Sequence, residues 1–151
     1  MPRAPDRPKL WRCPKCGARF VTKNLWHSCG RHSLADLLAG CDDATRALFP
    51  KLAVFARRHG GRGVTLVPQK TRAVFMIEAR FCAVYPRKDH LRLGLVLRRR
   101  LAHPRVVKIE DFGSVLVNSV RVRVPADLDA TLAAWLRESA ETYGRKSARP
   151  A

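Results

Sequence analysis

Hydrophobic and polar residues alternate along several stretches in the second half of the chain. The clearest is 91–98, where a leucine occupies every second position, and 72–79 and 116–124 alternate in the same way. Strict alternation predicts strands that bury one face. Shorter apolar runs predict three further strands, at 64–67, 81–85 and 106–109.

Helical spacing of apolar residues flanks these strands on both sides. Ser33 is an expected N-cap for a short helix that ends at Gly40, and a second helix is expected over 43–59. Pro50 either kinks this second helix or marks its true beginning. Asp127 is expected to cap a last helix. The order of elements predicts an α+β domain with a mostly antiparallel sheet and helices packed on one face.

A cluster of cysteines and histidines precedes the first helix. The motif C-P-K-C-G contributes Cys13 and Cys16, and H-S-C-G-R-H contributes His27, Cys29 and His32. Two such pairs can complete a tetrahedral zinc site. The three cysteines leave the fourth ligand open between the two histidines, and C-x-x-H spacing slightly favours His32. Four protein ligands leave no open position on the metal, so a zinc knuckle here is expected to be structural.

The charge of the chain is strongly positive. Its 151 residues include 30 Lys and Arg but only 12 Asp and Glu, which gives a net charge of +18. Residues 1–32 hold eight basic residues and one acidic residue, and residues 57–108 hold fourteen and two. These two blocks are therefore the expected contacts for a polyanion.

Several basic residues are candidates to hold such a ligand. The loop Pro68–Arg72 offers an amide, an ammonium, a hydroxyl and a guanidinium group in succession, a set that can bind phosphate or carboxylate. A second cluster follows the strand at 91–98. The candidate anion-binding residues are Lys70, Arg72, Arg80, Arg87, Lys88, Arg98, Arg99 and Arg100.

The function expected from these features is non-catalytic binding of nucleic acid, RNA or DNA, with weak sequence preference. No catalytic motif is present, so the chain is not expected to be an enzyme. One alternative is a small anionic ligand held by the Gln69-Lys70-Thr71-Arg72 loop in a pocket closed by Phe75, Phe81 and Tyr85. Another is a protein-interaction module in which the knuckle docks an acidic partner. Cations lining a concavity would favour the small ligand.

Four segments are expected along the chain. They are a disordered basic arm (1–9), the zinc knuckle (10–32), the α+β domain (33–144) and a disordered tail (145–151). No apolar stretch is long enough for a membrane helix, and none follows the basic start as in a signal peptide. A cytoplasmic location is therefore expected.

Four stretches of the chain carry a family resemblance. They are L-W-R-C-P-K-C-G-A-R-F-V-T-K-N-L-W-H-S-C-G, V-P-Q-K-T-R-A-V-F, Y-P-R-K-D and D-L-D-A-T-L-A-A-W-L-R-E. Over about Leu10 to Gly144 the chain resembles an uncharacterised bacterial family that joins a zinc-ribbon-like N-terminus to domain of unknown function 5655. The resemblance implies the α+β fold and a zinc ion. Its H-S-C element implies His27, rather than His32, as the fourth ligand. It implies no established activity.

Overall fold

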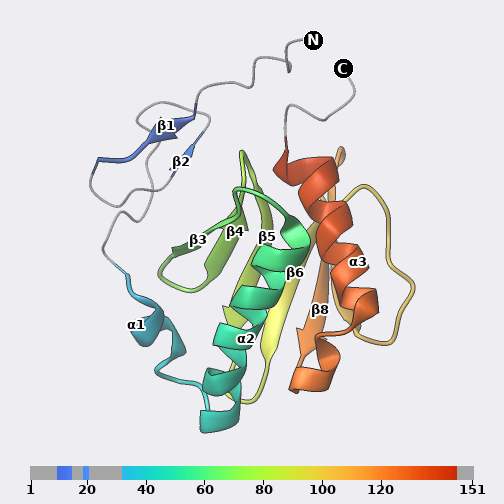
Figure 1. Cartoon of the computed structure of the whole chain (residues 1–151). Helices are drawn as coiled ribbons and strands as arrows, with labels where there is room; N and C mark the ends of the chain where they lie inside the picture. The colour runs from blue at the N-terminus through green and yellow to red at the C-terminus, as the bar shows by residue number, and fades with distance from the viewer. Residues whose placement is uncertain (1–9, 15–18, 21–31, 146–151) are drawn as a thin grey trace.

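A six-stranded antiparallel sheet forms the centre of the protein (Figure 1). The computed structural model describes residues 10–14, 19–20 and 32–145. The strand order is β3-β4-β5-β6-β8-β7, and every neighbouring pair is antiparallel. The strands are β3 (Thr65–Pro68), β4 (Ala73–Met76), β5 (Arg80–Pro86), β6 (Leu91–Leu97), β7 (Val106–Asp111) and β8 (Leu116–Val122). The antiparallel sheet predicted from alternation is confirmed.

Two long helices pack on the same face of this sheet (Figure 1). They are α2 (Asp43–Gly60), which continues through Pro50, and α3 (Ala130–Ser139). The short helix α1 (Leu34–Leu38) precedes them. A 3-10 turn, η1 (Pro125–Asp127), leads into α3, and a π-helical turn, η2 (Ala140–Gly144), follows it. The predicted α+β architecture is therefore correct.

The helix caps follow the expected chemistry with one correction. The Ser33 hydroxyl accepts a hydrogen bond from the Asp36 N–H at 3.1 Å, as a Ser N-cap does. Asp127 does not cap α3, because its carboxylate accepts from the backbone N–H of Arg123 in the turn before the helix. The N-cap of α3 is Asp129, whose carboxylate accepts from the Leu132 N–H at 3.0 Å.

The hydrophobic core lies between the sheet and the two long helices. Each odd-numbered leucine of β6 is at most 1% exposed and faces α2 and α3. Ser139 of α3 also reaches the sheet, because its hydroxyl lies 2.6 Å from the Phe81 carbonyl oxygen and 2.8 Å from that of Val96. The even-numbered residues of β6 point to the opposite side of the sheet, called the open face below.

The remaining strands form a small hairpin near the start of the chain. Strand β1 (Trp11–Arg12) pairs antiparallel with β2 (Arg19–Phe20). In the part of the chain that the structure describes, no helix is both long and apolar enough to cross a membrane.

Candidate functional site

Three large polar side chains lie in a row across the open face. Tyr85 of β5 is the direct partner of Arg92 of β6, and Arg92 is the direct partner of Arg121 of β8. Directly paired residues of antiparallel strands project from the same face. The three side chains therefore stand next to one another on three neighbouring strands, away from α2 and α3.

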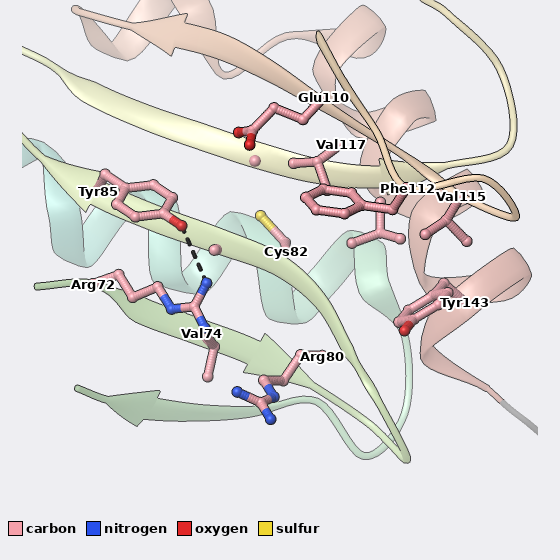
Figure 2. Close-up of a pocket in the computed structure, with 13 residues that line it drawn as sticks. Arg72, Val74, Arg80, Cys82, Tyr85, Glu110, Phe112, Val115, Val117 and Tyr143 are labelled. Atoms are coloured by element: carbon pink, nitrogen blue, oxygen red, sulfur yellow. Dashed lines mark hydrogen bonds between the residues drawn. The ribbon is translucent and has the colours of Figure 1, made fainter. Parts of the chain in front are cut away.

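Tyr85 holds two guanidinium groups in this row. The guanidinium carbon of Arg92 lies 4.7 Å from the centre of the Tyr85 ring. From the other side, Nη1 of Arg72 donates a hydrogen bond to the Tyr85 hydroxyl at 3.1 Å (Figure 2). The Nε of Arg72 donates to Oε1 of Gln69 at 2.8 Å. Cation–π contact and hydrogen bonds thus fix the positions of two positive charges on this face.

The guanidinium groups of Arg92 and Arg121 lack part of their hydrogen-bond and ion-pair partners among the described residues. Nε of each side chain is buried and has no hydrogen-bond partner among the described residues. No described carboxylate forms an ion pair with either arginine. Like charges directly opposite each other destabilise a sheet, and buried donors without acceptors cost free energy. An anion placed here would relieve both effects.

A pocket of about 390 Å³ adjoins this row on the open face (Figure 2). Its floor contains Ala83 and Gly94, which are direct partners on β5 and β6. The floor is low because glycine has no side chain: a Cβ added at Gly94 would lie 3.1 Å from Cγ1 of Val117. The other lining residues are Arg72, Val74, Arg80, Cys82, Tyr85, Val96, Glu110, Phe112, Val115, Val117 and Tyr143.

The charged groups of the pocket lie around its rim. Arg72 and Arg80 come from the β4–β5 side, and Glu110 comes from β7 (Figure 2). Glu110 lies 3.7 Å from Nζ of Lys108, and both side chains are substantially exposed, so this ion pair is weak. Phe112 stands beside this carboxylate side of the pocket and is 62% exposed. The pocket therefore combines cations, one carboxylate and an apolar floor.

Cys82 is the one cysteine at the pocket among the described residues, but its side chain faces the core, because Cys82 pairs directly with Leu95. Burial raises the pKa of its thiol to about 12. The thiol is therefore protonated at neutral pH, and a protonated thiol is a poor nucleophile. Cys82 acts here as a small apolar side chain.

The structure separates the predicted anion-binding residues into groups. It brings Arg72 and Arg80 into one pocket with Tyr85. Phe75 and Phe81 do not close that pocket, because both are fully buried in the core on the other face. The cationic turn after β5, which contains Arg87 and Lys88, and the exposed Lys70 are not among the lining residues.

Two arginines of the expected basic cluster at 98–100 form ion pairs with acidic neighbours. Nη2 of Arg99 lies 3.0 Å from Oε1 of Glu138, and Nη2 of Arg100 lies 3.5 Å from Oδ2 of Asp111. Arg98 is exposed and forms no ion pair with a described residue. These three arginines therefore do not offer three free charges to one ligand.

Most of the predicted zinc ligands lie outside the described residues. Cys13 is described, and it is buried directly after β1 of the β1–β2 pair. His32 is described and half-buried, whereas Cys16, His27 and Cys29 lie outside the described residues. The described residues contain no group of three possible metal ligands, so the zinc site stays a prediction.

The β1 strand lies beside the pocket. Trp11 packs against a second apolar cluster made by Val67, Val74 and Met76, on the open side of β3 and β4. Val74 also lines the pocket. The segment that begins the predicted knuckle thus packs against a cluster that shares Val74 with the pocket.

Comparison with protein families assigns the larger part of the chain. The model of domain of unknown function 5655 matches residues 34–142. The chain belongs to this family. The matched region contains all six strands of the large sheet and both long helices, so it carries the arginine row and every lining residue of the pocket except Tyr143. The comparisons with curated proteins and with solved structures found no match.

Proposed function

We propose that this protein is a non-catalytic binding protein for a small ligand that carries a phosphate or carboxylate group. The observation that carries the proposal is the Arg92–Arg121 pair, whose buried Nε groups have no acceptor among the described residues. Guanidinium groups bind such anions through paired hydrogen bonds. An anion would supply the missing acceptors and offset the repulsion between the two charges.

The adjoining pocket favours a small molecule over an extended surface ligand. Arg72 and Arg80 line a concavity, and its volume of about 390 Å³ falls within the range of small-molecule sites. Tyr85 is less suited to stacking on a nucleobase, because the Arg92 guanidinium lies over its ring. The arrangement therefore supports a small anionic ligand, but of the Gln69–Arg72 loop only Arg72 lines the pocket.

Calorimetric titration with ribose 5-phosphate and with citrate tests this proposal. Arg92→Gln and Arg121→Gln should each weaken binding about tenfold, since a hydrogen bond to a charged group contributes about 1.5–3 kcal/mol. The matched control is Arg57→Gln, which removes one exposed charge from α2 on the opposite side of the sheet. An equal loss in the control, or no binding of either anion to the native protein, would contradict the proposal.

Nucleic acid is a second candidate ligand, and the net charge of +18 favours it. Lys70, Arg87, Lys88 and Arg98 are exposed and form no ion pair with a described residue, so each is available to a phosphate backbone. Affinity for an oligonucleotide should fall steeply with salt, and Arg98→Ala should flatten the slope by about one unit. Absence of a mobility shift at low salt would exclude this candidate.

We also propose that the N-terminal segment binds one structural zinc ion. Its ligands would be Cys13, Cys16 and Cys29, with His27 or His32 as the fourth. The burial of the Cys13 thiol and the β1–β2 pairing that brackets the following residues support the proposal. Metal analysis of the purified protein should find about one zinc per chain. Comparison of His27→Ala with His32→Ala identifies the fourth ligand, and metal-free native protein would contradict the site.

A further inference from the structure

The two charged sides of the open face are separated along the strands. Arg92 and Val96 are four residues apart on β6, and Val96 pairs with Val117, which in turn pairs with Glu110. At the rise of a β-strand, four residues span about 13 Å. One ligand that reaches both sides must therefore be longer than a lone phosphate and must carry different groups at its two ends.

The surface between these sides suits a flat, uncharged group. Gly94 and Ala83 leave the floor low, and Val96 and Val117 continue it toward Glu110. Phe112 stands at the same side as Glu110 and is exposed, so its ring is available to a planar partner (Figure 2). Aromatic side chains stack readily on nucleobases.

Glu110 determines which hydrogen-bonding groups a ligand must present at the β7 side of the pocket. An ionised carboxylate only accepts hydrogen bonds, and its two oxygens can accept from two adjacent N–H groups. The guanine edge presents such a pair, the ring N1–H and the exocyclic amino group, whereas adenine presents a donor beside an acceptor. The weak ion pair with Lys108 leaves this carboxylate free to make such contacts.

We propose that the pocket, together with the arginine row beside it, binds a nucleoside monophosphate, and guanosine monophosphate in preference to other nucleotides. The phosphate lies against Arg72, Arg92 and Arg121, the ribose crosses Gly94, and the base meets Glu110 and Phe112. This assignment rests on the proposed function, because it uses the same arginine row for the anion. The assignment adds that the end of the ligand near Glu110 is a guanine base.

Calorimetry with four ligands tests the assignment. Guanosine monophosphate should bind about tenfold more tightly than ribose 5-phosphate, which lacks the base, and than guanosine, which lacks the phosphate. Inosine monophosphate, which lacks the exocyclic amino group, should fall between them. If ribose 5-phosphate binds as tightly as guanosine monophosphate, the base has no site and the assignment is wrong, although the proposed function stands. If none of the phosphorylated ligands binds, the assignment is wrong, and if citrate does not bind either, the proposed function fails with it.

Glu110→Gln provides the specificity test. The amide presents a donor beside an acceptor, so affinity for guanosine monophosphate should fall about tenfold, affinity for adenosine monophosphate should rise, and affinity for ribose 5-phosphate should stay unchanged. Because Glu110 is half-exposed, this variant is expected to fold. An unchanged preference would overturn the assignment. A 5′-phosphorylated oligonucleotide that displaces guanosine monophosphate at equal concentration would also overturn it, in favour of a strand end.

Gly94→Ala tests the position of the ligand. The added methyl raises the floor and should weaken guanosine monophosphate binding, whereas Arg57→Ala on the far side should not. The new Cβ lies 3.1 Å from Cγ1 of Val117, so the folded fraction of the variant is measured by urea unfolding beforehand. A folded Gly94→Ala protein with native affinity would show that no ligand crosses this floor.

Discussion

Replacing Arg121 with glutamine should make the ligand-free protein more stable. Arg121 is the direct cross-strand partner of Arg92, and its buried Nε has no acceptor among the described residues. Unlike Arg92, it makes no cation–π contact with Tyr85. Glutamine keeps part of the apolar stem and removes both the charge and the unpartnered Nε. The native residue therefore opposes folding in two ways that the variant removes.

The size of the gain follows from the spacing of paired strands. Side chains directly opposite start about 5 Å apart, where two unit charges repel by about 0.8 kcal/mol in water and about 3 kcal/mol at an effective dielectric constant of 20. Both arginines are only half-buried, so we adopt the lower part of this range. Arg121→Gln should raise the free energy of unfolding by about 1 kcal/mol through the charge alone.

Urea unfolding at low and high salt separates the contributions. Urea is preferable to guanidinium chloride because it does not screen charges. Arg121→Lys keeps the charge and removes the Nε, so the difference between Arg121→Gln and Arg121→Lys measures the repulsion. This difference should be about 1 kcal/mol at low salt and should shrink at 1 M salt, where the Debye length is about 3 Å. A glutamine variant less stable than the native protein, or a difference that ignores salt, would refute the reasoning.

Three further predictions concern the stability of the fold. Asn118→Ala should lower the free energy of unfolding by about 3 kcal/mol in urea, because the buried side chain accepts from the Leu101 N–H at 2.9 Å and donates to the Arg99 carbonyl at 3.0 Å. Ser139→Ala should cost about 1 kcal/mol by the same measurement, since its hydroxyl joins α3 to two strands. Burial raises the pKa of Asp129, but its hydrogen bond from Leu132 and its contact with Arg105 outweigh burial and lower it. Ionised Asp129 therefore stabilises the folded protein. This contribution is complete above about pH 4 and is lost as the pH falls through the lowered pKa of Asp129. Asp129→Asn should therefore make the free energy of unfolding depend less on pH in the acid range.

The sequence predicted the strands because one face of each strand is consistently apolar. The leucines of β6 alternate without interruption, and they point to the core as expected. Alternation did not predict the end of β4. It continues to residue 79, but the strand stops at Met76, where its register with β5 shifts. Alternation predicts which face of the sheet a residue lies on, but it does not predict the residue at which pairing with the neighbouring strand ends.

The arginine row could not be read from the sequence in the same way. Tyr85, Arg92 and Arg121 are far apart in the chain, and they meet only because β5, β6 and β8 are neighbours in register. The pattern 91–98 places Arg92 and Gly94 on one face, but it gives no information on which strands lie beside them. Strand order depends on long-range packing, so the composition of the open face had to come from the structure.

The location of the acidic residues decides how the positive charge acts. The described strands contain two carboxylates, and Glu110 is the one that shares a face with the arginine row through its pairing with Val117. Elsewhere, acidic side chains neutralise the basic ones: Glu138 pairs with Arg99, and Asp111 pairs with Arg100. A net charge of +18 alone would place a polyanion against any basic surface. Two of the three arginines at 98–100 have acidic neighbours, whereas the guanidinium groups of Arg92 and Arg121 have none among the described residues and lie beside a pocket. An anion is therefore expected to bind most favourably at the arginine row on the open face of the family domain.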